Sequence, residues 1–163
     1  MDFLKIELYN LYMRKPWVIF TSGCFDILHE GHYSLLNYCK EISYPGDIVV
    51  VGLNSDESVR RIKGNTRPFF NARERRLALE NLKSVDLVIE FDETNPQKIL
   101  GKIKPDLYVK GGDYDIQILS LDCIETPDTE IEIFNIKEGH STTNIIDRMN
   151  NIIKEEQLRF DFS

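Results

Sequence analysis

The stretch from Trp17 to His32 constrains the fold of this 163-residue chain more than any other. An apolar run that begins at Trp17 ends abruptly in Ser22-Gly23, and a compact loop then carries two histidines that flank a glycine, His29-Glu30-Gly31-His32. Apolar residues at helical spacing predict a helix from His32 to about Ile42. This succession places polar groups at the carboxyl end of a strand, where open α/β sheets bind ligands. The amino end of the helix adds free N–H groups, which suit phosphate.

The two histidines suggest a specific chemistry. Gly31 allows a ligand to approach the backbone closely, and imidazoles three positions apart at a helix start can point the same way. His29 and His32 could therefore donate hydrogen bonds to a phosphoryl oxygen as charge develops on it. Two alternatives stay open: an ordinary pair of histidines at a helix start, and a zinc site built from Cys24, His29, His32 and Cys39. We favour the phosphate role, because a zinc site would not need the basic segment described next.

Residues 60–76 form a basic segment in an acidic chain of net charge −7. Glu74 is its only acid, and its cations are Arg60, Arg61, Lys63, Arg67, Arg73, Arg75 and Arg76. We expect some of these arginines on a solvated helix face. Residues 63–68, in contrast, read as a loop that could close over a triphosphate. Arginine binds phosphate oxygens in bidentate fashion, and lysine acts as a point charge.

Apolar strands and helices alternate along the rest of the chain. We expect strands over 47–54, 86–91, 106–109 and 130–134, and helices over 57–62, 96–103 and 143–156. The first of these strands is almost purely apolar, which is typical of a parallel strand buried on both faces. The alternation predicts one α/β domain over 1–163, with a Rossmann-like, doubly wound, parallel five-stranded sheet. Residues 17–153 form its core, and residues 1–16 form a helical lead-in with an amphipathic helix at 2–13.

Composition excludes several classes of protein. Hydrophobic residues make up 42% and charged residues 29%, as in soluble globular proteins. No apolar run reaches the length of a membrane span, and the first residues lack the pattern of a secretion signal. Three cysteines at irregular spacing form no disulfide framework, which favours a reducing cytoplasm. The net charge of −7 argues against nucleic-acid binding, which depends on a basic surface.

Residues 23–32, which read Gly-Cys-Phe-Asp-Ile-Leu-His-Glu-Gly-His, resemble the signature of the HxGH nucleotidylyltransferase superfamily. Within its cytidylyltransferase-like members, the chain is most similar to the adenylyltransferase domain of the ADP-heptose synthases. Four further stretches match in the same order, at residues 51–56, 63–68, 109–114 and 141–146. The resemblance covers roughly residues 17–153, and five ordered blocks are far more specific than a lone pair of histidines.

The resemblance implies an enzyme that transfers AMP from ATP to a sugar 1-phosphate, most closely D-glycero-β-D-manno-heptose 1-phosphate, and releases pyrophosphate. It implies Mg²⁺ carried by ATP, no metal ligand from the protein, and a homodimer. His29, His32 and Lys63 would take part in catalysis, and Asp26 and Asp113 would contact the substrate. The nucleotide and its phosphates would be bound by Gly23, Cys24, Phe25, Gly31, Arg67, Arg75, Lys110, Gly111, Ser141, Thr142 and Thr143.

Some of these assignments have alternatives. Arg73 or Arg76 could take the place given to Arg75. The double glycine after Lys110 could be a plain tight turn, and the hydroxyls of residues 141–143 could serve only as helix caps.

The identity of the acceptor also has alternatives. The related glycerol-phosphate cytidylyltransferases have an arginine where Ile136 stands here, and His140 stands where the heptose enzymes often have a smaller residue. Asp113 could orient a substrate hydroxyl or hold a metal-bound water. Two other functions therefore stay open: a CTP-dependent cytidylyltransferase for a small phosphorylated alcohol such as glycerol 3-phosphate, and a non-catalytic nucleotide-binding module.

Overall fold

The computed structural model describes residues 14–112, 114–135 and 142–161. Within them, five strands form one sheet in the order β3-β2-β1-β4-β5, and all neighbouring strands are parallel. The strands are β1 (Val18–Gly23), β2 (Ile48–Asn54), β3 (Leu87–Phe91), β4 (Leu107–Gly111) and β5 (Glu130–Phe134). The helices are α2 (Glu30–Glu41), α3 (Asp56–Lys63), α4 (Ala72–Glu80), α5 (Gln97–Ile103), α6 (Ile116–Asp122) and α7 (Thr142–Asp161). The predicted Rossmann-like, parallel five-stranded sheet is therefore confirmed.

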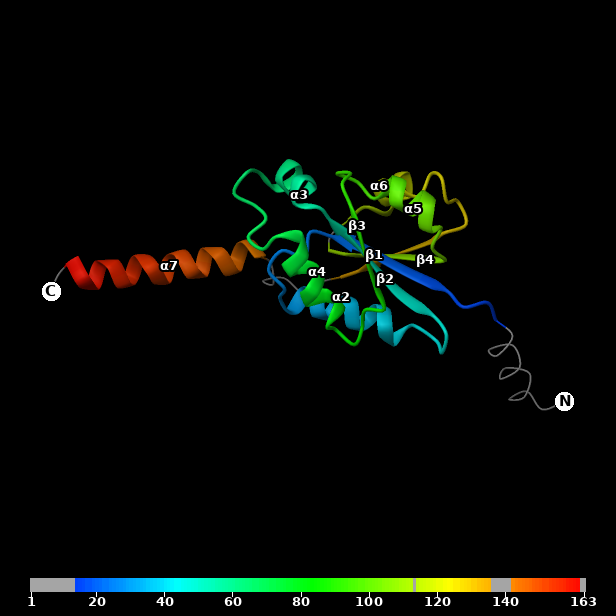
Figure 1. The fold of residues 1–163 in the computed structure, drawn as a ribbon, viewed down its shortest axis with the longest axis horizontal. Coiled ribbons are helices and arrows are strands. Elements are labelled where there is room, and N and C mark those ends of the chain that lie inside the picture. Colours follow the sequence, from blue (N-terminus) through cyan, green and yellow to red (C-terminus); the bar gives the residue numbers. More distant parts are fainter. Residues whose placement is uncertain (1–13, 113, 136–141, 162–163) are drawn as a thin grey trace.

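Helices cover both faces of the sheet, with α2 and α4 on one face and α5 and α6 on the other (Figure 1). Alternate residues of β1 and β2 feed the two resulting cores. Phe20 and Val50 pack toward α5 and α6, whereas Ile19 and Val49 pack toward α2. This two-sided burial explains why β2 is almost purely apolar. α7 extends away from the sheet and its covering helices in Figure 1.

The strand order reverses beside β1. The chain runs outward from β1 to β2 and β3, and then returns to lay β4 on the other side of β1. β1 pairs with β2 along its whole length, but its described pairs with β4 are Ile19 with Leu107 and Phe20 with Tyr108. Beyond these pairs the carboxyl ends of β1 and β4 lie at the topological switch point, where sheets of this kind bind ligands.

Several elements differ from the predictions. α2 begins at Glu30, two residues before the predicted start, because the His29 side chain accepts the Gly31 N–H and caps the helix. α4 and α6 were not predicted, although α4 opens with a capping box formed by Asn71 and Glu74. β4 continues to Gly111, past the predicted end at 109.

The predicted helix at 2–13 lies outside the described residues. No described helix combines the length and the apolar character needed to cross a membrane.

Aspartates tie the strands together at the amino edge of the sheet, opposite the switch point. Asp47 accepts the Trp17 N–H at 2.8 Å, and Asp106 accepts the Val18 N–H at the same distance. Asp86 does the same for Val49, also at 2.8 Å. In each case the carboxylate just before one strand binds the backbone at the start of its neighbour. These bonds fix the register at the edge that the site does not use.

Candidate active site

A cavity of about 430 Å³ lies at the carboxyl ends of β1, β2 and β4. Most of the predicted site residues line it, and they are Gly23, Cys24, Phe25, Asp26, His29, His32, Lys63, Arg67, Lys110 and Gly111. Predicted residues Asp113 and Ser141 lie outside the described residues, and Thr142 and Thr143 begin α7 with side chains that are also outside them. Gly31 does not line the cavity; it is buried in the first turn of α2, where its N–H binds His29.

The two histidines face each other at the start of α2. Their ring centroids are 3.9 Å apart, and the ring of Phe25 lies 5.1 Å from that of His32. His29 is the helix cap, and its Nδ1 accepts the Gly31 N–H at 3.2 Å. In the neutral ring this leaves the proton on Nε2, which makes that atom a donor.

His32 is the more buried member of the pair. Burial, followed by the neighbouring His29, lowers its pKa to about 3, against a raising contribution from a hydrogen bond with the Ile27 backbone. His32 is thus neutral near pH 7. Its Nδ1 is buried and, apart from the Ile27 backbone contact that acts on the pKa of the ring, has no hydrogen-bond partner of good geometry among the described residues. A buried ring nitrogen that the protein does not fully satisfy calls for an explanation, and a ligand in the cavity would supply one.

Cations converge on the cavity from different elements. Lys63 is the last residue of α3, Arg67 lies in the loop that follows, and Lys110 lies near the end of β4. All of them act on the Cys24 thiol: burial raises the pKa of Cys24, while Lys63, the buried Arg75, Lys110 and Arg67 lower it. The balance is a raised pKa, so Cys24 carries a protonated thiol. The cavity therefore presents positive charge and few anions to a ligand, which suits a polyphosphate.

Asp26 has a structural role that the sequence did not reveal. Its Oδ1 accepts the N–H groups of Phe69 and Phe70 at 2.7 and 2.9 Å, and its Oδ2 accepts the Arg67 Nε–H at 2.5 Å. The carboxylate is almost fully buried, at 3% exposure for the residue. Asp26 thus fastens the loop after α3 to the histidine-bearing turn. It also fixes one edge of the Arg67 guanidinium, which leaves the other edge for a ligand.

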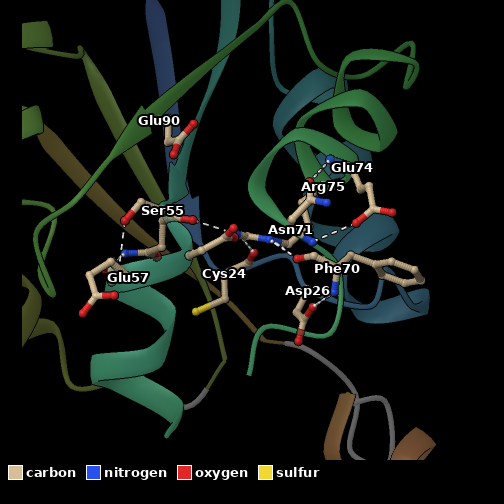
Figure 2. A network of polar contacts seen from close by, with 12 residues as sticks. Cys24, Asp26, Ser55, Glu57, Phe70, Asn71, Glu74, Arg75 and Glu90 are labelled. Carbon is tan, nitrogen blue, oxygen red and sulfur yellow. Dashed lines mark hydrogen bonds and ion pairs between the residues drawn. The ribbon is translucent and has the colours of Figure 1, made fainter. Parts of the chain in front are cut away.

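The structure does not place Arg75 where the predicted phosphate contact would require it. Figure 2 shows Arg75 reaching from α4 toward Cys24 and Phe70, and it does not line the cavity. Its side chain is fully buried and donates to the carbonyl oxygens of Cys24, Asn54 and Phe70 at 2.5, 2.9 and 2.9 Å. Its remaining edge pairs with Asp56 at 2.7 Å. These bonds join the turn after β1, the end of β2, the loop and α3 behind the cavity wall.

Arg73 and Arg76, the alternatives to Arg75, do not line the cavity either. Arg76 donates to the Val88 carbonyl oxygen at 2.9 Å, and Arg73 is exposed on α4. The cavity is instead extended by residues that the sequence did not single out, namely Ser22, Asn54, Ile62, Phe91, Thr94, Pro96 and Tyr114. One general signal could have found Ser22, Asn54 and Phe91: carboxyl ends of parallel strands meet at one edge of the sheet.

The zinc alternative is not supported. Among the described residues, no group of three or more His, Cys, Asp or Glu side chains could hold a metal ion. Cys39, which that alternative requires, is completely buried and packs in the core between α2 and the sheet.

Comparison with known proteins gives consistent matches over most of the chain. The family model described as "Cytidylyltransferase-like" matches residues 20–154. The protein named "Bifunctional protein HldE" from Syntrophotalea carbinolica is 42% identical over 149 residues, which are 91% of this chain and 29% of that protein. The protein of the same name from Campylobacter concisus is 45% identical over 136 residues, or 83% of this chain and 27% of that protein. The chain thus spans less than a third of the curated relatives that it matches.

A solved structure shares the fold. The crystal structure of the lipopolysaccharide core biosynthesis protein from Thermoplasma volcanium is 28% identical in sequence, with a TM-score of 0.61. The match covers 76% of this chain and 98% of that one.

Proposed function

This chain belongs to the cytidylyltransferase-like family of nucleotidyltransferases, and we propose that it transfers the AMP group of ATP to a sugar 1-phosphate. The proposed acceptor is D-glycero-β-D-manno-heptose 1-phosphate, and the products are the ADP-sugar and pyrophosphate. One observation carries the proposal: the paired His29 and His32 share a cavity with Lys63, Arg67 and Lys110 at the switch point of a parallel sheet. This combination suits the stabilisation of charge on phosphoryl groups.

In the proposed reaction, an oxygen of the sugar 1-phosphate attacks the α-phosphorus of ATP. A new oxygen–phosphorus bond forms, the bond between the α-phosphorus and the bridging oxygen breaks, and pyrophosphate leaves with that electron pair. No protein nucleophile is needed, so catalysis consists of positioning and electrostatic stabilisation. The Nε2–H of His29 would donate to a phosphate oxygen, with His32 beside it in the neutral form.

The cations would divide the phosphates between them. Lys63 and Arg67 would neutralise the leaving pyrophosphate, because they come from the end of α3 and the loop that Asp26 holds over the cavity. The amino end of α7 would add hydrogen-bond donors to the phosphates, from Ser141, Thr142 and Thr143. Backbone groups near Gly111 would meet the base, where hydrogen bonds discriminate strongly between ATP and CTP.

Mg²⁺ would enter with ATP and be held by phosphate oxygens. Among the described residues that line the cavity, the carboxylate is that of Asp26, and it is already bonded to Arg67 and to backbone N–H groups. When bound, the ion supplies charge neutralisation across the phosphates.

The test is a matrix of substrates with pyrophosphate release as the readout and mass spectrometry of the product. ATP and CTP are each offered with the heptose 1-phosphate in both anomers, with other sugar 1-phosphates, and with glycerol 3-phosphate. We expect turnover with ATP and a sugar 1-phosphate. Preferred turnover of CTP with glycerol 3-phosphate would replace the proposed substrates, and binding of ATP without turnover of any acceptor would indicate a non-catalytic module. The homodimer expected from the resemblance is checked on the same sample by analytical ultracentrifugation.

A further inference from the structure

A polar chain runs from the core of the sheet to the β4 side of the cavity. The hydroxyl of Tyr108 lies 3.2 Å from Ser22 Oγ, and Ser22 Oγ lies 3.3 Å from the Nζ of Lys110. The same Nζ donates to the Ser22 carbonyl oxygen at 2.9 Å. Ser22 and Lys110 line the cavity, whereas Tyr108 lies behind it. None of these contacts involves the histidines or the loop held by Asp26.

The hydroxyl of Tyr108 is not needed for packing. The Tyr108 side chain is fully buried, at 0% exposure for the residue, and its ring lies 5.7 Å from that of Phe20 in the core under α5 and α6. Phenylalanine would fill the same volume without a polar atom to satisfy. A buried hydroxyl must be hydrogen bonded to avoid a penalty, and the partner that the structure gives it is Ser22 Oγ. Tyr108 thus places its hydroxyl beside Ser22 Oγ from inside the core.

Lys110 carries a charge that has no ion-pair partner among the described residues. Its ammonium lies between two aromatic rings, 5.4 Å from the centroid of Tyr114 and 6.0 Å from that of Tyr108. Burial lowers the pKa of Lys110, the carboxylate of Asp122 raises it, and the positive charge of Lys63 lowers it further. An ammonium has three donors, and Ser22 accepts from this one through two atoms. Ser22 therefore does not satisfy all the donors of the ammonium, which leaves donor capacity for a group that enters the cavity.

We propose that Tyr108 is a positioning residue, which holds the Lys110 ammonium through Ser22 Oγ so that it meets a phosphate group of the ligand. The inference rests on the proposed function only in taking the ligand to be a polyphosphate. Lys63 and Arg67 reach the cavity from the β2 side of β1, and Lys110 reaches it from the β4 side. A chain of phosphates that crosses the end of β1 is thus contacted by cations on both sides.

The test uses inorganic tripolyphosphate as the probe, because its binding depends neither on the base nor on the acceptor. Calorimetry compares the unaltered protein with Lys110→Met, Tyr108→Phe, Ser22→Ala and the double variant Tyr108→Phe/Lys110→Met. Tyr38→Phe is the matched control, since it removes another hydroxyl, one bonded to Glu132 away from the cavity. Adenosine, which has no phosphate, is the second probe.

We expect Lys110→Met to weaken tripolyphosphate binding about tenfold or more and Tyr108→Phe about 2- to 10-fold, the range of one hydrogen bond. Ser22→Ala should resemble Tyr108→Phe, and Tyr38→Phe should have no effect. In the Lys110→Met background, Tyr108→Phe should cause no further loss, and adenosine binding should stay the same throughout.

Two results would overturn the proposal in different ways. The first concerns Tyr108→Phe, when the unaltered protein binds tripolyphosphate. If this variant binds tripolyphosphate equally well, or if it loses tripolyphosphate and adenosine binding to the same extent, the Tyr108–Ser22–Lys110 contacts only stabilise the fold. If the unaltered protein does not bind tripolyphosphate, the phosphate site and the proposed function fail together with the inference. Melting temperatures of all variants show whether a loss of binding reflects a loss of folding.

Discussion

The guanidinium of Arg75 lies 2.9 Å from the carbonyl oxygen of Asn54, buried behind the cavity rather than within it. The same nitrogen donates to the Cys24 carbonyl oxygen, so one side chain of α4 holds the carboxyl ends of β1 and β2. The basic segment at residues 60–76 therefore contains cations with two different structural roles. Lys63 and Arg67 line the cavity, and Arg75 supports its wall.

Replacing Arg75 with alanine should lower the free energy of unfolding by about 3 kcal/mol or more, because buried carbonyl oxygens lose their donor and Asp56 loses its partner. Urea unfolding measures the change. Arg73→Ala is the matched control, since Arg73 is exposed on the same helix, and it should change stability by about 0.5 kcal/mol or less. Unchanged stability with weakened nucleotide binding in Arg75→Ala would return Arg75 to the list of phosphate ligands.

Replacing His29 or His32 with alanine should lower kcat about 10²–10³-fold with little change in KM, because each group contributes mainly in the transition state. The measurement is steady-state pyrophosphate release. Tyr33→Phe, a change at an exposed position of the same helix, is the control and should leave kcat unchanged. A near-normal kcat in either histidine variant would remove that residue from the mechanism.

Replacing Lys63 with alanine should weaken the binding of a non-hydrolysable ATP analogue about 3- to 10-fold at low salt, and the difference should shrink at high salt because exposed charges are screened. Arg60→Ala is the control on the same helix, since Arg60 pairs with Glu57 and does not line the cavity. Calorimetry at two ionic strengths makes the comparison. Equal losses in the two variants at low salt would mean that the segment acts only through its general charge.

Stability should fall in acid because of the amino edge of the sheet. Burial of Asp47 raises its pKa, but the N–H groups of Trp17 and Tyr44 and the guanidinium of Arg14 outweigh it and hold the pKa below 3.8. Since the folded pKa lies below the unfolded one, Asp47 stabilises the fold above about pH 4 and loses this contribution as the pH falls below that value.

Asp47→Asn should therefore lower stability at pH 7 and flatten its decline between pH 4 and pH 2 (roughly the range in which aspartates titrate). Urea midpoints across this range measure the effect. Asp128→Asn, at an exposed position, should keep the slope of the unaltered protein. The prediction fails if Asp47→Asn and the unaltered protein lose stability in parallel.

The fold could be predicted because its signals are local. The apolar run of β2, the turn after Gly23 and the histidine pair each identify an element or its end within a few residues. The histidines, Lys63, Arg67 and Lys110 could be placed in one cavity because strand ends in a parallel sheet share an edge.

The roles of Asp26 and Arg75 could not be predicted from the sequence. Most of their partners are backbone groups: Asp26 accepts the N–H groups of Phe69 and Phe70, and Arg75 donates to the carbonyl oxygens of Cys24 and Asn54. Every residue other than proline carries both groups, so nothing in the sequence marks these as partners. A cation that binds phosphate and a cation that binds carbonyl oxygens look the same until the chain is folded.

The sequence separation between β1 and β4 bears on the order in which the two sides of the site come together. β1 meets β2 after about 30 residues, but its contact with the start of β4 joins Val18 to Asp106, 88 positions apart. Closing the longer loop costs about 1 kcal/mol more in chain entropy, so we expect the β1–β4 contact to form after the β1–β2 contact. His29 and Lys63 follow β1 and β2 in the chain, the strands that we expect to pair first. Lys110 lies in β4, which we expect to join later. A ligand held by both halves reinforces the last contacts to form, and hence protects the chain from opening at the seam between β1 and β4.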